Sequence, residues 1–160
     1  MTPFPALLNM LSEGRVDFVL VGGVAAIAHG SARLTQDVDI VYSRADANLE
    51  RLVAAVRPHA PYVRGAPPGL PFDWSAATVR AGLNFTLITE LGPLDLLGEI
   101  TGGGSYEDLV PHSAKLDVFG HDTLVLDLPW LIKVKRAAGR PKDLEVLAEL
   151  EALEEEQRRL

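Results

Sequence analysis

The segment FVLVGGVAAIAHGSARLTQDVDIVY, residues 18–42, decides the fold of this chain. Its first four residues are apolar, which predicts a buried strand, and the run 24–28 after the pair Gly22-Gly23 predicts a helix. Glycine has no Cβ, so backbone N–H groups at such a turn can approach a phosphate closely. The turn from strand to helix therefore predicts a phosphate-binding corner at Gly22 and Gly23.

Two aspartates follow near the end of the segment. Thirteen residues separate Gly23 from Asp37, and one valine separates Asp37 from Asp39. Alternation over residues 37–42 predicts a second strand with both carboxylates on one face and Val38 on the other. A glycine pair alone is common at turns, and an Asp-x-Asp pair alone is common on exposed strands. Their combination in one β-α-β unit predicts an anion site beside a site for a hard cation.

Length and composition set the broad class. At 160 residues with 48% hydrophobic content, the chain predicts one globular domain with a real core. The longest uncharged apolar stretch, residues 18–28, is shorter than the roughly 20 residues that span a bilayer, so no membrane partner is expected. The chain has no cysteine and its N-terminus lacks a secretory pattern, so we expect a cytoplasmic protein. The net charge of −7 argues against general binding to duplex nucleic acid but leaves RNA open.

The pattern along the chain predicts an α/β (α+β) fold in a single domain, 1–160, with an α/β core over 1–100 and a helical part over 127–160. We expect helices over 3–11, 45–57 and from 128 onward with a break near 139–141, and strands over 16–21, 37–42, 83–89, 94–97, 114–119 and 123–126. Prolines and glycines predict a mobile connector over 58–69 and a second flexible loop over 102–104. In the last helix a leucine recurs every three residues, which predicts packing against more than one element.

A third carboxylate is needed if two metal ions are to act together. Asp95 is our choice, because its leucine neighbours bury its surroundings and its strand could lie beside Asp39. The sequence leaves other acids open as alternatives: Asp73, Glu99 and Asp117.

Several polar side chains could contact an anion. Ser31 and Arg33 lie between the glycines and the aspartates, where they could reach phosphate oxygens, although a surface salt bridge also explains Arg33. His29 is expected to be a structural histidine. Five cations lie within ten residues of an otherwise acidic chain, and they could form either a solvated helix face or a phosphate contact: Lys133, Lys135, Arg136, Arg140 and Lys142.

The glycine pair, the gap and the string Asp37-Val38-Asp39-Ile40 resemble the signature of the DNA polymerase beta nucleotidyltransferase superfamily. The longer string 22–30, with Arg33 and Thr35, is similar to its AbiEii-type branch, as is the late string Arg140-Pro141-Lys142-Asp143. The resemblance implies a polymerase beta-like fold, a mixed β-sheet flanked by helices. It also implies that Asp37, Asp39 and Asp95 bind Mg²⁺ or Mn²⁺ and act in catalysis. The residues that it assigns to the nucleotide are Gly22, Gly23, Ser31, Arg33, Lys135, Arg140 and Lys142, with Asp143 orienting one of the cations.

The activity that the resemblance implies is transfer of a nucleoside monophosphate from an NTP such as ATP to an acceptor hydroxyl, with release of pyrophosphate. The acceptor could be a tRNA end, a protein or a small molecule. The alternative is a non-catalytic nucleotide-binding module, or a toxin–antitoxin component with an antitoxin-like partner, which the short chain motivates. A third possibility is a purely structural α/β domain.

Overall fold

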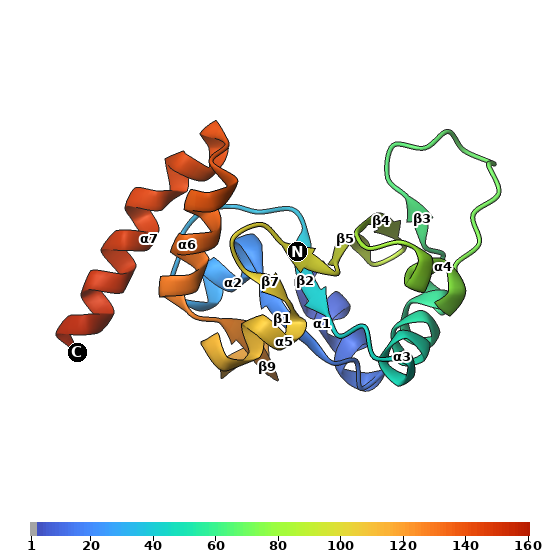
Figure 1. The fold of residues 1–160 in the computed structure, drawn as a ribbon, viewed down its shortest axis with the longest axis horizontal. Coiled ribbons are helices and arrows are strands. Elements are labelled where there is room, and N and C mark those ends of the chain that lie inside the picture. The colour runs from blue at the N-terminus through green and yellow to red at the C-terminus, as the bar shows by residue number, and fades with distance from the viewer. Residues whose placement is uncertain (1–2) are drawn as a thin grey trace.

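A computed structural model describes residues 3–160 (Figure 1). In this range the helices are α1 (Phe4–Glu13), α2 (Gly22–Ala28), α3 (Asp46–Val56), α4 (Ala76–Ala81), α5 (Tyr106–Leu109), α6 (Leu128–Ala138) and α7 (Pro141–Arg159), with 3-10 turns η1 (Arg57–His59) and η2 (Val110–His112). The strands are β1 (Phe18–Val21), β2 (Val38–Tyr42), β3 (Tyr62–Val63), β4 (Phe85–Thr89), β5 (Gly92–Leu97), β6 (Glu99–Ile100), β7 (Gly104–Ser105), β8 (Ser113–Val118) and β9 (His121–Leu126).

One mixed sheet organises the molecule. Across residues 3–160 it has seven strands in the order β3-β4-β5-β2-β1-β9-β8, while β6 and β7 pair separately. The neighbours β2–β5 and β1–β9 are parallel, and the others are antiparallel. The mixed sheet with its helices confirms the α+β prediction. The strands predicted over 114–119 and 123–126 are confirmed as β8 and β9, which pair antiparallel as a hairpin beside β1.

The core explains why β2 presents its acids outward. Val38 and Ile40 are fully buried, whereas Asp39 between them is only partly buried. The same core contains the apolar faces of α1 and α3, including Leu7 and Leu49. Alternation along the strand is therefore fixed by burial of its apolar face, and the carboxylate of Asp39 lies on the opposite side.

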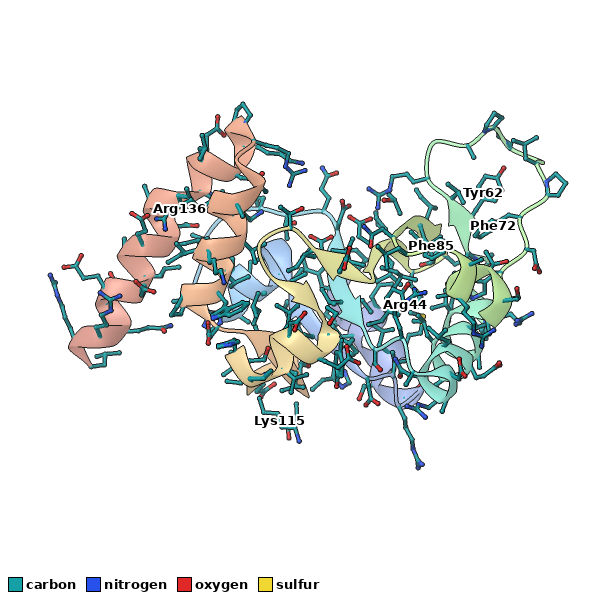
Figure 2. The ribbon with its side chains drawn as sticks, viewed as in Figure 1. Arg44, Tyr62, Phe72, Phe85, Lys115 and Arg136 are labelled. Carbon is teal, nitrogen blue, oxygen red and sulfur yellow. The ribbon has the colours of Figure 1, made fainter. Side chains whose placement is uncertain are left out.

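The expected connector over 58–69 is partly a strand, so the prediction of a loop was wrong there. Tyr62–Val63 forms β3, which pairs antiparallel with β4 at the sheet edge. Aromatic rings pack along the segment that follows: the Tyr62 and Phe72 ring centres are 6.1 Å apart (Figure 2). The ring centres of Trp74 and Phe85 are 6.3 Å apart. Two residues are too few for a period-two pattern to appear in the sequence. The expected loop 102–104 likewise ends in a strand, because Gly104 begins β7.

Helices α6 and α7 pack together at one end of the molecule (Figure 1). Gly139 joins them with a φ of 65°, a left-handed conformation that ends α6, so the predicted break is confirmed. On α7, Leu150 is buried and Leu153 also lies near Gly30, so the helix contacts more than one element, as expected. In the part of the chain described here, the helices are too short or too polar to cross a bilayer.

Candidate functional site

Three aspartates converge on two neighbouring strands, near the start of β2 and in the middle of β5. The parallel register of β2 and β5 pairs Asp39 with Asp95, and Asp37 lies just before β2. One carboxylate oxygen from each of the three lies within 4.8 Å of the others. The predicted convergence of these acids is therefore confirmed, and together they could hold a metal ion.

The three alternative acids have other surroundings. Asp73 accepts hydrogen bonds from Ser75 and Thr78 at the start of α4. Asp117 accepts a hydrogen bond from the backbone of Gly120 in the turn between β8 and β9. Glu99 lines a neighbouring cavity. Asp95 is thus the acid that the register places beside Asp39.

Asp39 has the most perturbed environment of the three. Burial raises its pKa to about 8, the nearby carboxylates of Asp95 and Asp37 add to the rise, and Lys135 opposes it. Its Oδ1 atom is buried and finds no hydrogen-bond partner among residues 3–160. A buried oxygen without a partner is costly, and three carboxylates offer the oxygen ligands that hard divalent cations prefer. The donor set therefore fits a hard divalent cation.

Arg64 contacts the triad, and the sequence reasoning missed it. Its Nη1 lies 3.2 Å from Asp37 Oδ2, and its Nη2 lies 3.1 Å from Asp95 Oδ1. The residue directly follows β3, and its backbone N–H donates to the carbonyl of Thr86 on β4 at 3.0 Å. A strand prediction over 62–63, paired with β4, would have pointed to Arg64, but this segment was expected to be a loop.

The glycine pair makes room for neighbouring side chains. Gly22 has a φ of 71°, and a Cβ placed there would collide with the carboxylate of Asp39. A Cβ on Gly23 would lie 2.6 Å from Thr35 Oγ1. Helix α2 has only seven residues, so its dipole is a minor source of anion binding. The main role of the two glycines is therefore steric: Gly22 leaves room for Asp39 on β2, and Gly23 leaves room for Thr35 in the loop before β2.

Replacing Gly22 with alanine should disrupt the triad. The substitution adds backbone strain at positive φ and pushes a methyl group against Asp39. We expect the free energy of unfolding to fall by about 2 to 3 kcal/mol, measured by thermal unfolding. The free energy of Mn²⁺ binding should weaken by a similar amount, measured by metal titration. Gly120→Ala is the matched control, because Gly120 has a φ of 87° but a Cβ at that position would meet no heavy atom within 4 Å. Equal effects of the two substitutions would contradict a steric role at the triad.

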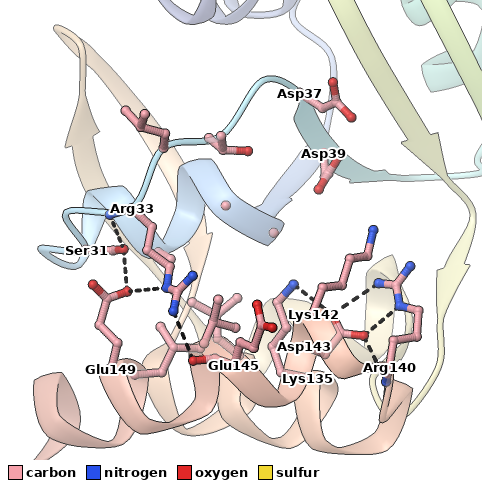
Figure 3. A pocket seen from close by; sticks show the side chains of 18 of the residues that line it. Ser31, Arg33, Asp37, Asp39, Lys135, Arg140, Lys142, Asp143, Glu145 and Glu149 are labelled. Atoms are coloured by element: carbon pink, nitrogen blue, oxygen red, sulfur yellow. Dashed lines mark hydrogen bonds and ion pairs between the residues drawn. The ribbon is translucent and has the colours of Figure 1, made fainter.

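A cavity of about 490 Å³ opens between the triad and the α6–α7 pair (Figure 3). This volume is in the range of small-molecule sites. All ten residues predicted for the site line it: Gly22, Gly23, Ser31, Arg33, Asp37, Asp39, Asp95, Lys135, Arg140 and Lys142. The structure therefore brings the predicted set together, with acids on the sheet side and most of the cations on the helical side.

Asp143 organises the cations of the helical wall (Figure 3). Its side chain is 1% exposed and accepts hydrogen bonds from Arg140 Nε at 2.6 Å and from Lys135 Nζ at 3.2 Å. Burial opposes ionisation of Asp143, but the hydrogen bonds from Arg140 and Lys135 prevail and lower its pKa. The buried carboxylate thus holds both cations at the cavity wall.

Ser31 and Arg33 are engaged with α7. Ser31 Oγ donates to Glu149 Oε1 at 2.7 Å, and Arg33 Nη2 donates to the carbonyl of Glu145 at 3.1 Å (Figure 3). These contacts connect the loop after α2 to the helical wall. Both acids on α7 were missed as site residues, since only the tertiary fold brings them to this loop.

The remaining candidates are explained by local contacts. Lys133 Nζ lies 4.1 Å from the ring centre of Trp130, and Arg136 pairs with Glu151 at 2.7 Å. His29 Nε2 lies 2.9 Å from the carbonyl oxygen of Leu126, which agrees with a structural histidine.

Comparison with known proteins found no matching family model and no significant match to a curated protein. The chemistry of the site is therefore argued from its own side chains.

Proposed function

We propose that the chain is a metal-dependent nucleotidyltransferase with a polymerase beta-like fold. One observation carries the proposal: a triad of aspartates and a group of cations line opposite walls of one cavity of about 490 Å³. A triphosphate bound to a divalent ion needs both oxygen ligands for the ion and cations for the phosphates. The motif resemblance over residues 22–42 and 140–143 supports the same activity.

The proposed roles follow from the contacts. Asp37 and Asp39 would hold Mg²⁺, which when bound would offset triphosphate charge and lower the pKa of the acceptor hydroxyl. Lys135 and Arg140 are oriented by Asp143 to meet phosphate oxygens. The acceptor oxygen forms a bond to the α-phosphorus, the bond from that phosphorus to the bridging oxygen breaks, and pyrophosphate leaves. We assign Asp95, beside Asp39, the role of general base: its carboxylate accepts the proton that the acceptor hydroxyl loses in this step.

Lys142 supplies a further cation for the triphosphate. It lines the cavity and takes part in none of the ion pairs found within residues 3–160. Arg33, by contrast, already contacts α7. The acceptor classes that fit an attacking hydroxyl are an RNA end such as that of tRNA, a protein and a small molecule.

Transfer from radiolabelled NTPs tests the proposal. Wild-type protein, Mg²⁺ and each α-labelled NTP are incubated with total RNA, cell protein or an aminoglycoside, and label transfer and pyrophosphate are measured. Asp95→Asn should lower transfer at least about 100-fold, as when an electrostatic stabiliser of a transition state is lost. Asp46→Asn is the matched control, because Asp46 is an exposed acid paired with Arg80 outside the cavity.

Three outcomes separate the candidate functions. Transfer that requires Asp95 supports the enzyme. A rise in melting temperature with Mg²⁺ and NTP but no pyrophosphate supports the non-catalytic binding module, since a ligand that binds only the folded state stabilises it. No thermal response to any NTP with Mg²⁺ contradicts both and favours a structural domain.

A further inference from the structure

Strand register brings Arg64 to the acidic triad. Its backbone N–H donates to the carbonyl of Thr86, Thr86 pairs with Asp95 on β5, and Asp95 pairs with Asp39 on β2. Residues that pair across neighbouring strands direct their side chains to the same face of the sheet. Thr86 is short and exposed, so the long side chain of Arg64 can pass over β4. The backbone pairing of these strands therefore places the guanidinium of Arg64 on the same face of the sheet as the acids.

The guanidinium satisfies only part of the triad. It bridges Asp37 and Asp95, at 3.2 and 3.1 Å, and its side chain is 31% exposed. Within the described residues 3–160, two buried polar atoms here have no hydrogen-bond partner, Arg64 Nε and Asp39 Oδ1. Buried donors and acceptors without partners are costly. The contacts between Arg64 and the triad therefore leave polar atoms unpaired, and a cation that pairs better with the carboxylates can replace the guanidinium.

We infer that Arg64 is an exchangeable counter-ion of the triad: it holds Asp37 and Asp95 together in the metal-free protein and is displaced when a divalent cation binds. The inference rests on the proposed metal site. Guanidinium and cation would use the same two carboxylates, and like charges at such short separations repel. Because each then weakens the binding of the other, Arg64 lowers the affinity of the triad for metal.

Metal binding by an Arg64 variant tests this inference without any assay of activity. Mn²⁺ is titrated into wild-type protein and Arg64→Gln in the absence of nucleotide, and free Mn²⁺ is followed by electron paramagnetic resonance. We expect Arg64→Gln to bind Mn²⁺ about tenfold more tightly, the size of a typical coupling between two ligands. Its metal-free melting temperature should fall, because Asp37 and Asp95 then repel each other without a counter-ion.

Arg51→Gln is the matched control. It removes another arginine–aspartate pair, Arg51–Asp17 at 3.1 Å, and Asp17 directly precedes Phe18, at the opposite end of β1 from Val21, the residue that pairs with Asp39. This substitution should leave Mn²⁺ affinity unchanged. If Arg64→Gln binds Mn²⁺ no more tightly than wild type, the inference is overturned while the metal site stands. If folded wild-type protein binds no Mn²⁺, the proposed metal site itself fails.

A measurement on wild-type protein covers the case in which Arg64→Gln does not fold. The Nε–Hε signal of Arg64 is assigned in a ¹⁵N-labelled sample by its loss in Arg64→Lys, and Mg²⁺ is then added. Displacement predicts that this signal shifts with metal concentration while that of Arg51 stays fixed. An Arg64 signal that stays unchanged at saturating Mg²⁺ overturns the inference.

Discussion

Asp39→Asn is expected to stabilise the metal-free protein and to abolish its response to Mg²⁺. Burial and the two neighbouring carboxylates raise the pKa of Asp39 to about 8 in the folded chain, against 3.8 for an ordinary aspartate. Between these values the unfolded chain loses the proton while the folded chain keeps it, so stability falls as pH rises from about 4 to about 8. Asparagine removes this cost, which at pH 7 is at most about 4 kcal/mol.

The measurement is thermal unfolding in chelator and in Mg²⁺ over a range of pH. In chelator at pH 7 the variant should melt about 5 °C above wild type, and the difference should vanish near pH 4. In Mg²⁺ only the wild type should gain stability, because asparagine is a poor replacement for a metal-binding carboxylate. Asp37→Asn is the comparison, since it removes a partner of Arg64 and should lower the metal-free melting temperature. If Asp39→Asn is less stable than wild type in chelator at pH 7, the raised pKa of Asp39 is contradicted.

Asp143→Ala should be the most damaging substitution on the helical wall. Asp143 is 1% exposed and accepts hydrogen bonds from Lys135, from the Arg140 side chain and from the Arg140 backbone at the start of α7. Removing it leaves two cations close together without their shared acceptor. We expect a loss of about 2 to 3 kcal/mol in the free energy of unfolding. The proposed nucleotide transfer should also fall strongly, because the cations are no longer held.

Urea unfolding of wild type and variant at several pH values measures this loss. The folded-state pKa of Asp143 is lowered, so its contribution is present above the unfolded pKa near 4 and declines as pH falls through the folded value. The two proteins should therefore converge in acid. Glu151→Ala is the control, because the Arg136–Glu151 pair is exposed and should be worth less than about 1 kcal/mol. Equal losses from the two substitutions would show that Asp143 has no special role.

The predictable part of the structure is the part set by strong local patterns. Alternation over residues 37–42 identified β2 and the facing of Asp39, and the buried setting of Asp95 pointed to its neighbouring strand. The cations over residues 133–142 could be grouped from their spacing, and three of them, Lys135, Arg140 and Lys142, line one cavity on either side of the turn at Gly139. Local sequence patterns and the apolar neighbours of the acids are therefore enough to predict the residues of the acidic and basic walls.

The remaining site residues depend on long-range pairing that leaves no local trace. Arg64 is positioned by β3, a strand of two residues in a segment rich in proline and glycine. Ser31 and Arg33 do line the cavity, but their contacts with Glu149 and Glu145 follow from the packing of α7. Such partners are more than 100 positions apart in the sequence, and no periodicity connects them.

The pairing of Asp39 with Asp95 links the aspartate triad to the folding of the sheet. The two residues belong to segments that are far apart in the chain, and they meet only when β2 and β5 lie side by side in their parallel register. A partly folded molecule that has formed β1 and β2 alone lacks Asp95, the third member of the aspartate triad. The proposed metal site is therefore complete only in chains in which both β2 and β5 have joined the sheet.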